Sequence, residues 1–398
     1  MLEILVALLM GVVFGCITGL TPGLHINVLA FFIVSCSAYL SKYFSPLSLA
    51  SFIVSVSITH TFIDFIPSIF LGSPDEDTGL SILPGHSMLL KGKGHEAVVH
   101  TLYGGLLALL IILFLSPVFI LFLPKFYPFI KSVMLFILLL SSFYLLFRES
   151  NFLVSVLIFM MSGLIGISSA ILPINDSLLP MLTGLFGASS LITSIAKKQI
   201  IPKQETKKVC FRIKNFLKIL FPASFASSVC SFLPALGSGQ AAVIASDIMK
   251  NPDKKSFLML IGSINTIVMG LSIISLYSIN VKRTGSAVAI SSLLDSFSLF
   301  EVFVFILVIL FSGILSVFIA EKISIFLANN ISRINYCKLS LFVLIFLLCV
   351  VIIFSGFLGL VVFIVSAFTG LFAVSVGARR TLLMGCLMIP TILFYIPV

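Results

Sequence analysis

The sequence predicts an all-α integral membrane protein: a polytopic helical bundle of about 10–14 membrane segments, in two inverted repeats with broken or re-entrant helices. Three observations predict it. First, 60% of the 398 residues are apolar and only 10% are charged, whereas about a quarter of a soluble domain is charged. Second, apolar runs of about 20 residues, the length that crosses a bilayer, recur along the whole chain. Third, short segments of the first half recur in order in the second.

The apolar runs are unbroken rather than alternating, so each is expected to be a helix and not a strand of a membrane barrel. The long runs lie at 2–20, 47–71, 97–123, 130–147, 151–170, 256–279, 299–320, 338–356 and 358–376. Shorter apolar pieces lie at 26–41, 178–195, 219–233, 240–249, 284–294 and 381–397. The first run opens with Glu3 and no base, so we interpret it as a membrane helix and not as a signal peptide.

Charge and motif content exclude several classes of function. The bases lie in short loops between the runs, as the positive-inside rule predicts, so the net charge of +10 does not indicate nucleic acid. The seven cysteines form no CxxC pair and the five histidines match no compact metal motif, so no metal site is expected. The chain has no P-loop and no GxSxG elbow. We therefore expect no enzyme and no cofactor beyond a coupling ion.

The most basic stretch divides the chain near its middle. Residues 197–218 hold eight Lys or Arg and one Glu, and are expected to form a cytoplasmic linker in a multi-pass protein of the cell membrane. The linker separates a first transmembrane repeat, 1–196, from a second, 219–398. An odd number of crossings in each half, with both termini outside, fits the lack of bases at the N-terminus.

Four pairs of short segments indicate a duplication, which is the architecture of many secondary transporters. The pairs occur in the same order in both halves, at offsets that drift as loop insertions would make them drift. They are Leu20–Leu24 with Phe232–Leu236, Ser57–Thr61 with Ser263–Thr266, Thr78–Ile82 with Thr284–Val288, and Thr183–Gly187 with Thr369–Ala373.

Two interruptions containing Pro and Gly lie at corresponding places in the halves. Residues 15–27 read GCITGLTPGLHIN and residues 231–240 read SFLPALGSGQ. Pro removes a backbone donor, so each stretch is expected to unwind at membrane depth and present backbone groups and half-helix N-termini to substrate or ion. The alternative is a kinked helix or tight hairpin satisfied by its neighbours. The candidate binding residues are Thr21, Pro22, Gly23, His25, Asn27, Pro234, Gly237, Ser238, Gly239 and Gln240.

Two ionisable residues interrupt the apolar run 47–71. His60 and Asp64 lie four residues apart and therefore share a helix face. Ionisable groups in membrane helices are costly, and a His–carboxylate pair can bind or relay a proton, so both are candidates for ion coupling. The alternative is a structural pair that holds two helices together.

A loop between two apolar runs carries a concentrated negative charge. Its acidic triplet aligns with a stretch of the second half that carries two bases: Asp75, Glu76 and Asp77 match Val281, Lys282 and Arg283. Opposite charges at matched positions are candidates for a gate between the halves. The alternative is that both are solvated loop ends.

Several of these stretches together resemble the large permease subunit of tripartite tricarboxylate transporters, the TctA-like family. The likeness runs the length of the chain, as in a divergent short branch of the family. In the second break Ala235 stands where the family has a glycine. The segments that carry the resemblance are Gly19–His25, Pro67–Pro74, Leu83–Ala97, Thr183–Phe186 and Leu233–Gly237.

The resemblance implies a permease that moves a small organic anion, a carboxylate, with Na⁺ or H⁺. It also implies a small membrane subunit and an extracytoplasmic binding protein as partners. Substrate and ion would lie where the two breaks converge, near Gly72, Ser73 and Thr78. The acidic loop and the short chain depart from the family, so its fold carries over better than its substrate. The alternatives are a flippase for a lipid-linked phosphate, such as a polyprenyl phosphate, and an intramembrane enzyme; a homo-oligomer is compatible with each.

Overall fold

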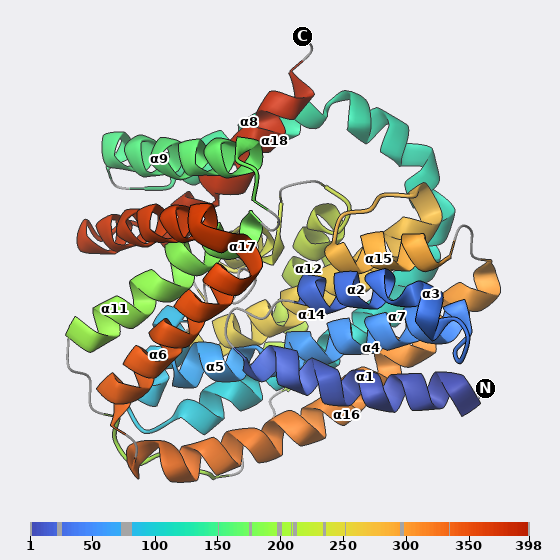
Figure 1. The fold of residues 1–398 in the computed structure, drawn as a ribbon, viewed down its shortest axis with the longest axis horizontal. Helices are drawn as coiled ribbons and strands as arrows, with labels where there is room; N and C mark the ends of the chain where they lie inside the picture. Colours follow the sequence, from blue (N-terminus) through green and yellow to red (C-terminus); the bar gives the residue numbers. More distant parts are fainter. Residues whose placement is uncertain are drawn as a thin grey trace.

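A computed structural model gives the fold of the chain (Figure 1). The described residues are 2–21, 26–72, 82–149, 151–174, 177–196, 201–207, 209, 213–233, 236–250, 252–294, 298–333 and 335–396. Within these ranges the secondary structure is helical throughout, with no strand. The prediction of an all-α fold is confirmed.

The helices follow one another in a similar order in the two parts of the chain. Before the linker they are α1 (Leu2–Leu20), α2 (Ile26–Ser35), α3 (Ser37–Leu40), α4 (Pro46–Ile63), α5 (Phe65–Phe70), α6 (Ile82–Leu89), α7 (Gly94–Ser132), α8 (Met134–Phe147), α9 (Phe152–Ile171), α10 (Leu178–Leu182), the π-helix η2 (Thr183–Ala188) and α11 (Ser189–Ala196). After it come α12 (Ile213–Cys230), α13 (Ser238–Ile248), α14 (Lys254–Ile279), α15 (Gly285–Leu293), α16 (Leu299–Asn330), the 3₁₀ turn η3 (Ile331–Arg333), α17 (Tyr336–Ser375), the 3₁₀ turn η4 (Arg380–Met384) and α18 (Gly385–Tyr395).

Seven helices within the described ranges are long and apolar enough to cross a membrane, and four shorter apolar helices accompany them. The chain is therefore a polytopic membrane protein, as predicted. The expected runs 338–356 and 358–376 form one helix, α17, which bends at Gly356 with a φ of 68°. The predicted linker is shorter than expected, because its last six residues already belong to α12. There Lys218 is exposed while Ile219 is buried, so Lys218 lies on the outer face of the helix.

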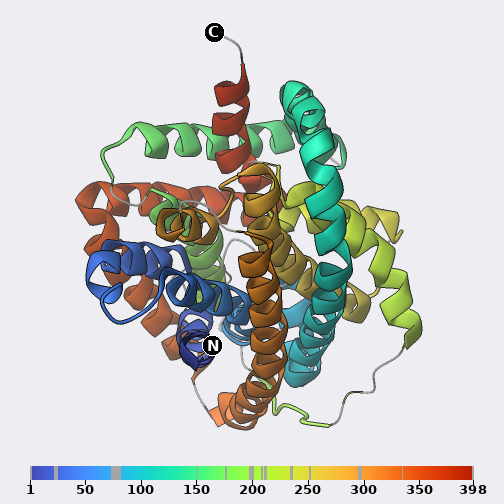
Figure 2. The same cartoon turned by 90° about the vertical axis from the view of Figure 1, so that its right-hand side faces the viewer.

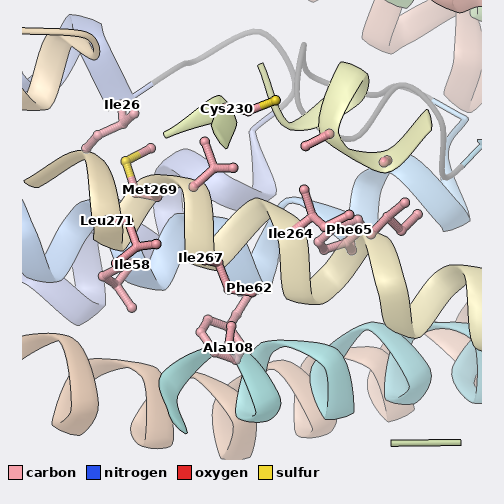
Figure 3. Packing of buried hydrophobic residues seen from close by; sticks show 14 of the residues in the cluster. Ile26, Ile58, Phe62, Phe65, Ala108, Cys230, Ile264, Ile267, Met269 and Leu271 are labelled. Atoms are coloured by element: carbon pink, nitrogen blue, oxygen red, sulfur yellow. The ribbon is translucent and has the colours of Figure 1, made fainter. Parts of the chain in front are cut away.

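Helices α4 and α14 form the centre of the bundle. In each span the most apolar window is 94% buried, compared with 39% in α9 and 28% in α17. The two helices run antiparallel, because Thr61 contacts Thr266 while Asp64, one turn further along α4, contacts Asn265. Figure 3 shows the same order, with Ile58 toward Leu271 and Phe65 toward Ile264.

Small residues bring the neighbouring helices close to this pair. On α1, Gly11, Gly15 and Gly19 follow one another at helical spacing against α4, and a Cβ on Gly15 would lie 2.5 Å from the Cβ of Thr59. On α7, a Cβ on Gly104 would lie 2.0 Å from the carbonyl oxygen of Met259 in α14. Helices pack in lipid through such close backbone approach, since no hydrophobic effect separates them from the lipid tails.

The two parts of the chain exchange packing partners. Helix α4 contacts α16, and α14 contacts α7, so each central helix packs on a long helix of the other part. At the periphery, α17 packs on α10, η2 and α11, while α9 packs on η4 and α18. Figure 2 shows α7 and α16, in cyan and orange, passing through the bundle beside each other.

The members of one of the four segment pairs lie against each other. Thr183 lies in η2, after α9, whereas Thr369 lies within α17. The two segments pack against each other: a Cβ on Gly370 would lie 2.2 Å from the carbonyl oxygen of Leu185. The two segments therefore form a close helix contact through small residues.

The described part of the linker, 201–207, lies along the turn between α6 and α7. The side chain of Gln204 accepts a hydrogen bond from the Gly94 amide at 2.8 Å and donates one to the Leu89 carbonyl at 3.0 Å. The Glu205 amide donates to the Gly92 carbonyl at 2.7 Å. In Figure 1 the N-terminus lies at the opposite end of the bundle from this segment.

Candidate functional site

A row of buried polar side chains crosses the centre of the bundle on α4. His60 and Asp64 are 3% and 2% exposed, and they lie on one helix side as the spacing predicts. The Nδ1 atom of His60 lies 3.1 Å from Thr18 Oγ1 on α1, and Asn265 on α14 donates to Asp64 Oδ2 at 2.9 Å. The carboxylate is therefore buried inside the protein.

Three hydroxyls on the same helix reach three different neighbours. Ser57 Oγ donates to Ser286 Oγ on α15 at 2.8 Å. Thr59 accepts from Ser316 on α16 at 3.0 Å, and Thr61 Oγ1 lies 3.0 Å from Thr266 Oγ1 on α14. Together with His60 and Asp64, these side chains join α4 to α1, α14, α15 and α16.

Local sequence explains where α4 begins and ends. Ser45 caps its first turn by accepting from the Ser48 amide at 3.3 Å, and Pro46 takes the first helical position, where its missing N–H has no partner to lose. The helix ends at Asp64, and α5 follows directly. Asp64 thus lies at a helix junction in the protein interior.

The first break begins beside Asp64. Helix α1 ends at Leu20, and Thr21 donates its hydroxyl back to the Ile17 carbonyl at 2.7 Å. A Cβ on Gly19 would lie 3.3 Å from the Asp64 amide nitrogen, so the chain leaves α1 next to the backbone of Asp64. Of the remaining predicted residues here, Pro22, Gly23 and His25 lie outside the described part of the chain, as does the side chain of Asn27.

The second break ends at a half-helix in the interior. Gly237 precedes α13 with extended backbone, and its amide donates to Gln240 Oε1 at 2.8 Å. Ser238, Gly239 and Gln240 form the buried first turn of α13. Pro234 lies outside the described residues.

Of the gate candidates, Lys282 and Arg283 are described, while Asp75 and Asp77 are not. Lys282 is exposed. Arg283 is half-buried, and its Nη2 donates to the Leu236 carbonyl at 2.7 Å, directly before α13. Arg283 therefore points toward the second break rather than into a solvated loop end.

The helix ends that flank the two breaks lie on the same side of α14. Ile26 begins α2 after the first break and Cys230 ends α12 before the second. Both belong to one buried cluster, and Figure 3 shows them on the same side of α14, with Ala108 opposite. Gly72 is buried with a φ of 65°, while Ser73 and Thr78 lie outside the described residues.

The structure adds residues that the sequence reasoning did not select. Thr18, Asn265, Thr266 and Ser286 each bond a polar side chain of α4. A signal was present, because Asn265 and Thr266 interrupt an apolar run and repeat the pattern of Ser57–Thr61. Thr18 lies in the first break and Ser286 in a repeated segment, but nothing singled out their hydroxyls, since such groups are common in membrane helices and often bond their own backbone.

The described groups form a compact set of donors and acceptors. A carboxylate, an imidazole, a carboxamide and several hydroxyls surround one crossing of helices. Oxygen-rich surroundings suit Na⁺, and a carboxylate near an imidazole suits a proton. Buried ionisable groups in membrane helices are typical of ion and substrate pathways.

Comparisons with known proteins agree with this architecture. The family model of the tripartite tricarboxylate transporter TctA family matches residues 5–385. An uncharacterised protein of Methanocaldococcus jannaschii is 34% identical over 401 residues, covering 98% of this chain and 99% of that protein. The short length is thus shared with that relative. No solved structure matches the chain.

Proposed function

Because the chain belongs to the tripartite tricarboxylate transporter TctA family, we propose that it is a secondary-active permease for a small organic anion. The substrate is a carboxylate, moved across the cytoplasmic membrane by alternating access and coupled to Na⁺ or H⁺. The observation that carries this proposal is the buried carboxylate of Asp64, placed where α1, α4 and α14 meet beside the first break.

The helix order supports two inverted repeats, residues 1–196 and 219–398 with the linker between them. Helices α4 and α14 occupy matched places in the two parts, and they cross antiparallel. A two-fold axis in the membrane plane relates matched helices in that way. The exchange of long helices between the parts, α7 onto α14 and α16 onto α4, fits the same axis.

Asp64 and His60 are the proposed coupling residues. A proton or Na⁺ at Asp64 would neutralise its charge and change its bond to Asn265, which links the two central helices. Rocking of one repeat against the other would then depend on the ion. Thr21 and the turn Gly237–Gln240 are the proposed substrate contacts, with Pro22, Gly23, His25 and Asn27 completing the first break.

Charge distribution supports a cytoplasmic linker with both termini outside. The linker lies on the α6–α7 turn beside Lys93, and Lys254 and Lys255 at the start of α14 reach Ser87 and Glu96 of the same region. This end of the bundle is therefore rich in bases. The turn before α16, which would match the α6–α7 turn in the second repeat, carries no base.

Family membership supports two proposed partners, a small membrane subunit and an extracytoplasmic binding protein that delivers the substrate. The gate between Asp75, Asp77 and the Lys282–Arg283 pair is part of the same proposal. Opposite charges there would pair when one side of the pathway is closed.

Uptake into proteoliposomes tests the proposal. Candidate carboxylates are supplied under imposed Na⁺ and H⁺ gradients, to wild type, Gly237→Leu and the control Gly187→Ala, where an added Cβ meets only ordinary contacts at 3.6 and 3.7 Å. We expect gradient-driven accumulation in wild type and the control, and none in Gly237→Leu. If no carboxylate accumulates under either gradient, the carboxylate assignment is wrong, and a labelled polyprenyl phosphate tests the flippase alternative in the same vesicles.

A further inference from the structure

The start of α13 combines features of an anion site. Helix α13 has 11 residues and follows Gly237, whose carbonyl accepts the first intrahelical bond, from Ala241, at 3.2 Å. The amide groups of a first helical turn have no intrahelical acceptor, and the helix dipole makes this end positive. Such an end, held inside a protein, favours a negatively charged ligand.

Arg283 adds a full positive charge beside the start of α13. Its Nη2 donates to the carbonyl of Leu236, the residue directly before Gly237. Arg283 also precedes Thr284, the N-cap of α15, whose Oγ1 accepts from the Ala287 amide at 3.1 Å. The guanidinium therefore adds its charge to the positive end of α13, while the backbone of Arg283 directly precedes α15.

Gln240 gives an independent indication of a ligand. The residue is 3% exposed, and its Oε1 accepts from the Gly237 amide, which folds the carboxamide over the start of α13. Its Nε2 is buried and has no hydrogen-bond partner among the described residues. A buried donor without an acceptor is costly, so the orientation of Gln240 points to an acceptor supplied by a ligand.

We propose that Arg283, Gln240 and the first turn of α13 form a subsite that binds one carboxylate group of the substrate. A planar carboxylate suits it, because two oxygens can accept from a guanidinium fork while a third contact comes from Gln240 Nε2. This assigns substrate recognition to Arg283 in place of a purely gating role. The subsite rests on the proposed permease function and specifies which group of its substrate the protein recognises.

Binding of carboxylates to purified protein in detergent tests the subsite without transport. Acetate, succinate and citrate, with their neutral amides, are titrated against wild type, Arg283→Gln, Gln240→Leu and Lys282→Gln by calorimetry. Lys282 is the matched control, since it is adjacent to Arg283, equally charged and exposed, and it belongs to the proposed gate and not to the subsite. Arg283→Lys is included because it keeps a donor for the Leu236 carbonyl if Arg283→Gln fails to fold.

We expect wild type and Lys282→Gln to bind a carboxylate and not its amide, and Arg283→Gln and Gln240→Leu to bind on the order of 10- to 100-fold more weakly. Arg283→Lys should also lose affinity, because an ammonium cannot bind bidentately. Equal carboxylate affinity in wild type, Arg283→Lys and Gln240→Leu would overturn the subsite and leave the permease proposal standing. Absence of any carboxylate binding to wild type would overturn the subsite together with the carboxylate assignment.

Discussion

Helices α4 and α14 are equally buried, but their polar residues behave differently. On α14, Ser263, Ser272 and Ser275 donate to carbonyls of their own helix. On α4, by contrast, the polar side chains from Ser57 to Asp64 reach four other helices. On α14, Asn265 and Thr266 bond to polar side chains of the α4 segment. Burial of a polar residue in a membrane helix therefore says little about its role, whereas a bond to another helix identifies a place where helices are held in register.

The two halves of the chain also differ in the charged groups that they supply. The first half supplies the ionisable pair His60 and Asp64, and the second supplies Arg283 and the half-helix α13. If the halves are inverted repeats, they have specialised: one toward the coupling ion, the other toward the anionic substrate. Variants of these residues and of their packing contacts test the difference.

Asp64→Asn removes the charge of α4 while it keeps an oxygen that can accept from Asn265. We expect gradient-driven uptake to fall to background, because the ion loses its counter-charge, while the protein remains folded. Uptake and size-exclusion profile are measured on the same preparation. Uptake at the wild-type rate would show that Asp64 has only a structural role.

The exchange Asp64→Asn with Asn265→Asp moves the carboxylate to α14 and preserves the hydrogen bond between the helices. We expect near-wild-type thermal stability without recovery of uptake, because His60 and the first break remain beside position 64. Recovered uptake would show that the location of the charge on α4 is not required.

Gly104→Ala tests the packing of α7 on α14. The added Cβ would lie 2.0 Å from the Met259 carbonyl oxygen, so the helices must separate, at a cost of about 1–3 kcal/mol for an overpacked contact. We expect a lower thermal midpoint in a fluorescence size-exclusion assay. Gly187→Ala is the control, and equal midpoints for the two variants would contradict the packing.

Thr61→Val, Thr266→Val and the double variant measure one bond between the central helices. Hydrogen bonds between membrane helices contribute about 0.6 kcal/mol on average, so each single change should have a small effect. The double-mutant cycle should give a coupling free energy of that size. Additive effects would show that the hydroxyls at positions 61 and 266 do not interact.

Most helix boundaries could be predicted because each depends on local composition. The apolar runs predicted α1, α9, α14 and α15 to within two residues. The bend of α17 falls at Gly356, where the sequence analysis ended one run before the next. The merging of 97–123 with the following residues into α7 could not be predicted, because its internal prolines, Pro117, Pro124 and Pro128, ordinarily indicate a helix end and are tolerated here.

The candidate site could be predicted only in part. His60 and Asp64 were identifiable because ionisable residues in an apolar run are rare. Their partners Thr18 and Asn265 depend on which helices cross and at what height, and residues that are distant in sequence carry no local signal of that crossing.

The sequence alone was enough to predict a membrane protein with helical secondary structure. It was also enough to predict that helices end at the polar stretches that contain Pro and Gly. These properties follow from hydrophobicity and backbone chemistry, which act over a few neighbouring residues. The folded structure was needed to place α4 and α14 at the centre, to bring Asp64 to Asn265 and to put Arg283 at the start of α13. Those contacts depend on close helix packing through residues such as Gly104, where the fit of two distant segments sets the arrangement.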